Sequence, residues 1–330
     1  MILSFTALVF AAILIYASCE FFVNGVEWCG RKTGMAENAV GTVLAAFGTA
    51  LPESIVTLVA VAFGHGPGAK QIGIGAALGG PLVLSTLAYA VVGWTMVATR
   101  RRRASAALAV NRARLSRDQG WFLLIFVCKI TLGLVAFTIK PWLGFAFLGA
   151  YALYVWGEIN HRDDREQESL GPLKIRPHNA DPGLAWALLQ TAVALAVIFF
   201  ASELFVEQIE IVAPVLGVPP ALSALLLSPV ATELPETMNA IIWVRQGKER
   251  LALANISGAM MIQATVPSAL GLFFTPWLFG PGLITAGVIT TLSILGLLVL
   301  LRRNALTAPR LSLFGLLYVV FVVTLLIIRR

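Results

Sequence analysis

The sequence predicts an all-α integral membrane protein with ten transmembrane helices, arranged as two inverted five-helix repeats. The first observation is composition, because 58% of the 330 residues are hydrophobic and only 12% are charged, whereas soluble domains carry roughly 25% charged residues. The second is the number of apolar stretches long enough to cross a bilayer. The third is a short phrase, Thr-x-Leu-Pro-Glu, which ends once at Glu53 and again at Glu236, 183 residues later.

Ten apolar stretches have the length of about 20 residues that a helix needs to cross the hydrocarbon core. The first is too long, and too weakly charged at its start, for a cleaved signal peptide, so we expect it to be retained as a helix. With boundaries good to a few residues, the ten predicted helices cover residues 3–24, 37–63, 71–98, 120–139, 141–157, 184–208, 219–244, 251–275, 281–301 and 311–328.

The lysine and arginine residues separate by loop, and this predicts the orientation of the chain. When the loops are numbered alternately, nineteen of the 24 fall on one side, and one more, Lys129, falls inside a helix. Because basic loops stay in the cytoplasm, we expect a plasma (inner) membrane protein with both termini outside the cytoplasm. The net charge of +7 then needs no nucleic-acid partner to explain it. The loops and ends on the opposite side of the membrane carry only four basic residues, Lys70, Lys140, Arg329 and Arg330.

A hydrophilic cytoplasmic linker, residues 158–181, divides the chain into a first repeat, residues 1–157, and a second repeat, residues 182–330. Each half contains five predicted helices, and because five is odd, the second half enters the membrane in the opposite orientation. At the constant offset of 183 residues, nine positions are identical, including three glutamate pairs. Inverted repeats of this kind are common in secondary transporters, whose binding sites lie near the midplane between the repeats.

The repeated phrase carries the groups that a cation site needs. Proline has no N–H and crowds the carbonyl four residues back, so Pro52 frees the carbonyl of Gly48 and Pro235 frees that of Ala231. In lipid each freed carbonyl must find a partner. Carbonyl, hydroxyl and carboxylate oxygens together are the ligands of hard cations such as calcium. The predicted ion-binding residues are therefore Gly48, Thr49, Glu53, Ala231, Thr232 and Glu236.

The two glutamates also explain why such a chain would exchange ions. One charged residue at the bilayer centre costs roughly 2.5–3.5 kcal/mol. Two facing carboxylates repel each other as well, so each takes up a proton unless a cation lies between them. The pair therefore suits the exchange of a divalent cation for protons or monovalent ions. The structural alternative is that each glutamate is protonated and only forms a hydrogen bond across the helix pair.

The two phrases resemble the Gly-Thr-Ser-Leu-Pro-Glu motifs of the calcium/cation antiporter superfamily, which includes sodium/calcium exchangers. Residues 48–53 match five of the six motif positions, and residues 231–236 match four. The resemblance covers nearly the whole chain. It implies ten helices in inverted halves, with Glu53 and Glu236 as the ion-carrying groups. It also implies a core of the second, third, seventh and eighth helices, past which the first and sixth helices slide to give alternating access.

The chain departs from the superfamily on the third and eighth helices, where the family carries a Gly-Asn-x-x-Gly-Ser-Asn stretch. The first copy, residues 75–81, keeps none of these polar side chains, and the second keeps Asn255, with Gln263 further along. Glu233 replaces the motif serine and adds a carboxylate three residues before Glu236, near the same helix face. Asn255, Gln263 and Glu233 therefore join the predicted site. Because a proton needs only a carboxylate, the lost neutral oxygens favour protons over sodium as the counter-ion.

Other charges inside the predicted helices leave several interpretations open. Lys129 either extends to the membrane surface, pairs with a glutamate, or stands in for a cation. Glu20 and Glu203 are equivalent positions on the first and sixth helices. They either line an ion entrance or lie beside water at helix ends.

The sequence therefore predicts a secondary-active cation antiporter, with calcium as the first candidate substrate and protons or sodium as the counter-ion. The alternative is a degenerate exchanger-fold protein with a scaffold or regulatory role and no ion exchange. An intramembrane enzyme is not expected, because the sequence has no clustered Asp or His near a cytoplasmic mouth. The spacing of the three cysteines fits no metal site. No cofactor is predicted, and the expected partners are the lipid bilayer and the transported cations.

Overall fold

The computed structural model describes residues 2–33, 45–99, 111–160 and 171–328, and every element within these ranges is helical. The side chains of residues 45–50, 158–160, 235 and 328 lie outside this description. The α-helices are α1 (Ile2–Lys32), α3 (Ala45–Leu58), α4 (Ala69–Val83), α5 (Tyr89–Thr99), α6 (Arg112–Leu134), α7 (Leu143–Asn160), α8 (Leu184–Val215), α9 (Pro220–Thr232), α10 (Leu234–Gln246), α11 (Glu249–Phe274), α12 (Pro281–Arg302), α13 (Ala308–Ser312) and α14 (Phe314–Ile328).

Within the described ranges, six helical segments are long and apolar enough to cross a membrane. Helix α3 continues into a π-helical turn, and a second π-helical turn joins α4 to α5 in one long apolar segment. Two further apolar helices, Leu51–Phe63 and Pro220–Thr232, are shorter. The six long segments are Ile2–Lys32, Ala69–Thr99, Leu184–Val215, Glu249–Phe274, Pro281–Arg302 and Ala308–Ile327.

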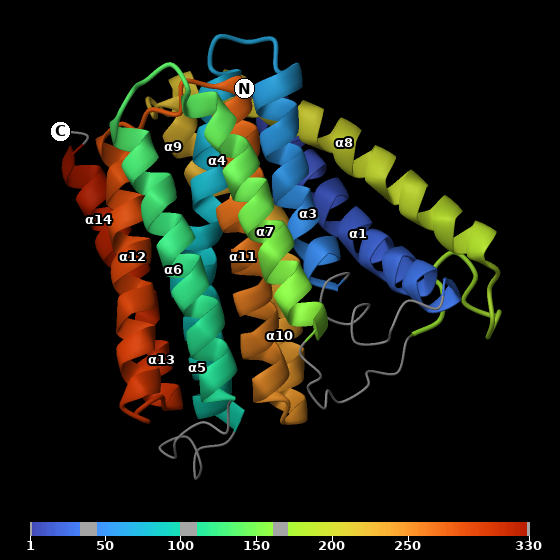
Figure 1. Ribbon diagram of the computed structural model, residues 1–330. Helices are drawn as coiled ribbons and strands as arrows, with labels where there is room; N and C mark the ends of the chain where they lie inside the picture. The colour runs from blue at the N-terminus through green and yellow to red at the C-terminus, as the bar shows by residue number, and fades with distance from the viewer. Residues whose placement is uncertain (1, 34–44, 100–110, 161–170, 329–330) are drawn as a thin grey trace.

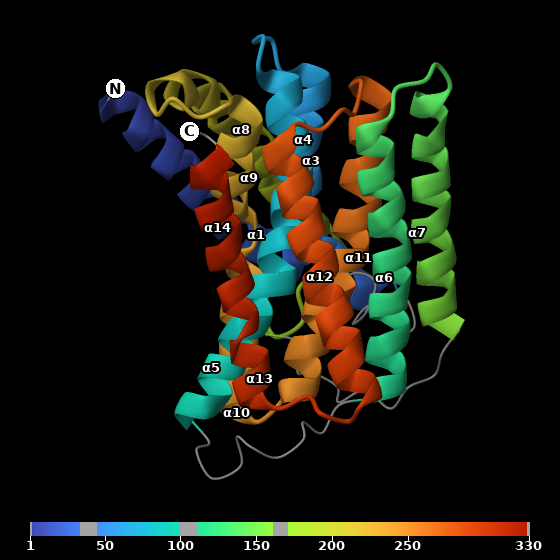
Figure 2. The same ribbon diagram turned by 90° about the vertical axis from the view of Figure 1, so that its left-hand side faces the viewer.

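The helices form a bundle in which the two halves of the chain interleave. Helices α1 and α8 lie side by side and obliquely along one flank, while α12 and α14 lie on the opposite flank (Figure 1). Between the flanks, α4 packs most extensively on α9, and α3 on α11. Helix α1 begins and α14 ends at the same end of the bundle, as Figure 2 shows. The centre of the fold therefore joins segments that are far apart in the sequence.

Glycine residues let α4 approach the backbone of α9 closely. A Cβ atom on Gly79 would lie only 2.6 Å from the carbonyl oxygen of Leu225, and one on Gly75 would overlap the carbonyl of Ala221. Membrane helices gain little from hydrophobic exclusion, so they associate through small residues that allow close packing. These two glycines bring a helix of the first half against a helix of the second.

The predicted helix at residues 219–244 is two helices in the structure. Helix α9 ends at Thr232 and α10 begins two residues later, with Glu233 between them. Pro235 explains the break, since it cannot donate to the carbonyl of Ala231 and its ring crowds that turn. The prolines inside α3, α4 and α11 leave those helices continuous.

The hydrophilic segment at residues 171–181 lies against α1 and α8. The indole Nε1 of Trp28 in α1 donates to the carbonyl oxygen of Gly171 at 3.0 Å. The amide Nε2 of Gln190 in α8 donates to the carbonyl oxygen of Phe21 in α1 at 2.7 Å. The segment and the two oblique helices are therefore tied together by hydrogen bonds.

Two ion pairs strengthen this attachment. Lys174 donates to the carboxylate of Glu20 at 2.5 Å, and Lys32 pairs with Asp181. The hydrogen bond from Lys32 holds the pKa of the Asp181 carboxyl group below its usual value. Glu20 thus binds the connecting segment, with about half of its side chain exposed.

Replacing Gly75 with alanine is expected to lower the apparent melting temperature of the detergent-purified protein. The new Cβ would force α4 away from α9, and overpacking of this kind costs about 1–3 kcal/mol. Gly149→Ala is the matched control, because nothing outside its own turn of α7 lies within 4 Å of the Cβ position, and alanine is the better helix former. Equal melting temperatures for the two variants would contradict the close approach of α4 and α9.

Candidate cation site

Glu53 of α3 is buried, with 1% of its surface exposed. Its carboxylate packs directly on the backbone of Gly80 in α4, where any side chain would collide with it. The superfamily motif has a serine at this position of the third helix. In this chain the carboxylate itself fills the space that a polar ligand would take.

Two further carboxyl groups come from the break between α9 and α10. Glu233 accepts hydrogen bonds from Thr232 Oγ1 at 2.9 Å and from Gln263 Nε2 of α11 at 2.8 Å. Glu236 is completely buried in the first turn of α10, where the helix dipole favours negative charge. The carboxyl group of Glu53 interacts electrostatically with both. Three acidic side chains from the two halves of the chain therefore lie in one buried region.

Lys129 of α6 reaches the same region and is completely buried. Its ammonium group donates to the carbonyl oxygen of Ala77 at 2.6 Å and to that of Gln263 at 3.3 Å, and it interacts with the charge of Glu53. The indole Nε1 of Trp277 donates to the backbone carbonyl of Lys129 at 3.3 Å. Lys129 therefore does not extend to the membrane surface, which leaves pairing with a glutamate and standing in for a cation.

The remaining residues predicted for the site have different surroundings. Ala231 and Thr232 are buried at the end of α9, next to the helix break. Gly48 and Thr49 belong to α3, but their side chains lie outside the described residues. The structure does not join Asn255 to the carboxyl groups, because its buried Nδ2 has no hydrogen-bond partner among the described residues.

Two backbone features of the site were absent from the sequence-based prediction. The first is the carbonyl of Ala77, and its signal was available in Pro81, which cannot donate to the carbonyl four residues before it. The second is the open face of Gly80 beneath the Glu53 carboxylate. The sequence holds no signal for this contact, because it exists only once α3 and α4 are packed.

Within the described residues, no group of three or more His, Cys, Asp or Glu side chains is positioned to hold a metal ion. The three carboxyl groups interact but do not converge on one point. Calcium takes six to eight oxygen ligands, so it would also need neutral oxygens such as the Thr232 hydroxyl. The geometry provides a buried, negatively charged region that protons or a cation can neutralise.

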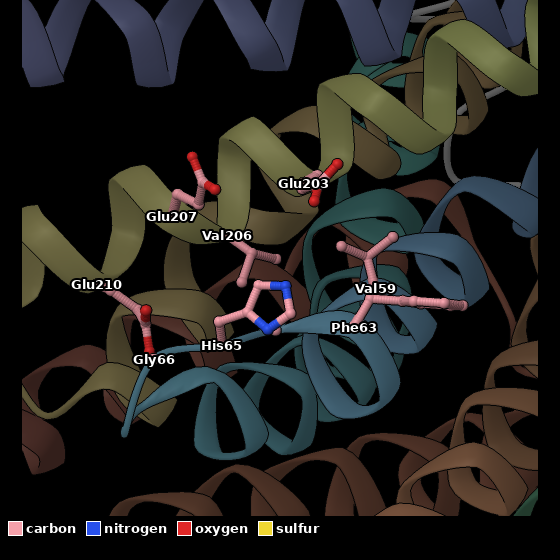
Figure 3. A pocket seen from close by; sticks show the side chains of 9 residues that line it. Val59, Phe63, His65, Gly66, Glu203, Val206, Glu207 and Glu210 are labelled. Carbon is pink, nitrogen blue, oxygen red and sulfur yellow. The ribbon is translucent and has the colours of Figure 1, made fainter.

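A pocket of about 180 Å³ lies beside α8, near the loop that leads into α4. Figure 3 shows Glu203, Glu207 and Glu210 spaced along α8, with His65 of the loop below them. An acidic lining attracts cations, so this pocket agrees with the interpretation that Glu203 lines an ion entrance. Its equivalent in the first half, Glu20, is instead bound to Lys174.

The chain is similar to ion exchangers over nearly its whole length. The family model described as "Sodium/calcium exchanger protein" matches residues 3–159 and 186–327. "Inner membrane protein YrbG" of Escherichia coli (strain K12) is 26% identical over 289 residues, which are 84% of this chain and 81% of that protein.

Two solved structures share the fold. The H+/Ca2+ exchanger CAX superposes with a TM-score of 0.77 at 16% identity, covering 98% of this chain and 82% of that one. The sodium-calcium exchanger NCX_Mj superposes with a TM-score of 0.63 at 20% identity, covering 98% of this chain and 99% of that one.

Gln263→Met is expected to lower stability by about 1–3 kcal/mol, because Glu233 loses a buried hydrogen-bond donor. Gln119→Met is the matched control, since the buried Gln119 amide donates to Ser257 Oγ at 2.8 Å and not to an acidic group. Thermal unfolding should detect a loss in both variants. The calcium affinity, measured by equilibrium dialysis with radioactive calcium, should differ from that of the wild type only in Gln263→Met. An equal change in both would contradict a role of Gln263 in the site.

Proposed function

Because this chain belongs to the sodium/calcium exchanger protein family, we propose that it exchanges calcium, or a related cation, for protons at the acidic region of Glu53, Glu233 and Glu236. The family and the exchangers that share its fold make it a multi-pass membrane cation antiporter and not an enzyme. The observation that carries the finer proposal is that these three carboxyl groups and the ammonium group of Lys129 are all buried, and that Glu53 interacts electrostatically with the other three groups.

The balance of charge in the site suggests how exchange would occur. When all four groups are ionised, the three carboxylates and the ammonium of Lys129 together carry a net charge of −2. Uncompensated charge is costly in the bilayer core, so the site is stable with two protons bound or with one divalent cation bound. Calcium then displaces protons and protons displace calcium, as antiport requires.

The shortage of neutral oxygens supports protons rather than sodium as the counter-ion. Helix α4 carries Ala76, Gly80 and Pro81 where the superfamily motif has Asn, Ser and Asn. Sodium must be surrounded by oxygens that replace its hydration shell, whereas a proton needs only a carboxylate. No resident cofactor is required, since the transported ions alone carry the charge.

The architecture that we propose is ten transmembrane helices in two inverted halves, residues 1–157 and 182–330, joined by a cytoplasmic linker at residues 158–181. A two-fold axis in the membrane plane would exchange the pair α3–α11 with the pair α9–α4, and both pairs pack extensively. The charge of the loops favours an inner-membrane protein with both termini outside the cytoplasm. In this proposal the helices α1 and α8, which lie obliquely along one flank (Figure 1), slide past the central helices to give alternating access.

Glu53→Gln and Glu236→Gln are each expected to reduce calcium uptake into proteoliposomes under a proton gradient. The reduction should be about 10- to 100-fold, because an interaction with a charged group contributes about 1.5–3 kcal/mol. Glu249→Gln, in the first turn of α11, is the matched control and should transport like the wild type. Calcium uptake that requires a sodium gradient and does not depend on the proton gradient would contradict proton coupling.

A second candidate function is a membrane scaffold or regulator that has kept the fold and lost ion exchange. It is favoured by the loss of polar ligands on α4 and by Lys129, whose ammonium already neutralises part of the site. The same proteoliposomes decide between the two. No flux under a proton or a sodium gradient, in the wild type and in Glu53→Gln alike, would favour the scaffold and overturn the antiporter.

A further inference from the structure

Lys129 contributes one positive charge to the balance proposed above, and the surroundings of its buried ammonium group suggest a second role. Its ammonium donates to groups from two helices, the carbonyl of Ala77 in α4 and the carbonyl of Gln263 in α11, and it interacts electrostatically with Glu53 of α3 without a hydrogen bond between them. The ring of Phe126, one turn before Lys129, has its centroid 5.5 Å from the ammonium nitrogen. Both halves of the chain therefore contribute to the surroundings of one positive charge.

The two carbonyls that bind the ammonium share a specific cause. Ala77 lies four residues before Pro81, and Gln263 lies four residues before Pro267, with both prolines inside their helices. Proline has no N–H, so neither carbonyl can receive its normal helical hydrogen bond. Because hydrocarbon supplies no water, each of these carbonyls needs another donor or a cation.

A position of this composition would suit a small monovalent cation. Backbone carbonyl oxygens can replace the hydration shell of an alkali ion, a carboxylate supplies the opposite charge, and an aromatic face attracts cations. A lysine ammonium offers three donors and no acceptor, so it satisfies the same oxygens without leaving an orphaned polar atom of its own.

We propose that Lys129 is a tethered cation, whose ammonium permanently occupies a monovalent-cation position built from the carbonyls of Ala77 and Gln263, with the buried carboxyl group of Glu53 supplying opposite charge without touching it. Lys129 is then a specificity-determining residue, because sodium and potassium cannot enter a position that the chain itself fills. The consequence for transport is exchange that runs without sodium, and this consequence rests on the proposed function. The occupation of the position by Lys129 does not rest on the proposed function, because binding measurements test it without any transport.

The test compares variants that differ in charge and in volume. Lys129→Ala removes both, which opens the position, whereas Lys129→Met removes the charge and keeps most of the volume. Each detergent-purified protein is titrated with sodium chloride and potassium chloride against choline chloride, with thermal unfolding and radioactive sodium binding as readouts. Lys129→Ala should bind sodium or potassium saturably, at least about tenfold more tightly than the wild type or Lys129→Met. Adding Glu53→Gln to Lys129→Ala should remove this binding.

Two results would overturn the proposal. Saturable sodium binding by the wild type would show that the position is not filled by the chain. If Lys129→Ala responds to sodium and potassium no more than Lys129→Met does, the ammonium only ties α6 to α4 and α11. If Lys129→Ala is unfolded in choline, refolding in sodium or potassium but not in choline supports a vacated cation position, and unfolding in all three salts contradicts it.

Discussion

The bilayer core supplies no water, and this single constraint governs how the central helices are built. Every proline inside a membrane helix leaves a carbonyl without its donor, and every buried carboxylate needs a neutralising partner. Pro81 and Pro267 create two such carbonyls, and Lys129 satisfies both. The same ammonium interacts with Glu53. The two carbonyls that lack a helical donor and the buried charges of Glu53 and Lys129 are each costly alone. They lie in one region between the two halves of the chain, where they can stabilise one another.

Close packing of the halves makes this arrangement possible. Gly75 and Gly79 allow the backbone of α4 to lie against α9, and Gly80 leaves room for the Glu53 carboxylate. The break at Glu233 turns α9 into α10, so that Glu233 and Glu236 both point into the buried region, where Gln263 of α11 holds the first. Small residues, helix breaks and acidic groups thus act as one unit, and each would be unfavourable without the others.

Much of this site was visible in the sequence, because an inverted repeat places equivalent residues in the same surroundings. The repeated Leu-Pro-Glu phrase predicted that Glu53 and Glu236 are buried, and the extra carboxylate of Glu233 was assigned to the same region. The contacts of Lys129 were left open, since one residue on one helix has no symmetric copy to compare. Asn255 was placed in the site by motif alone, and the structure leaves its amide without a link to the carboxyl groups. Such contacts depend on how helices rotate against one another, which apolar periodicity does not determine.

The most direct measurement is proton release when calcium is added to the detergent-purified protein in weak buffer with a pH indicator. If three carboxyl groups are set against one ammonium, binding of one calcium ion should release about two protons. A Glu53→Gln/Glu236→Gln double variant should release none. Calcium binding without proton release, or release that persists in the double variant, would contradict a site in which calcium and protons compete for the same carboxylates.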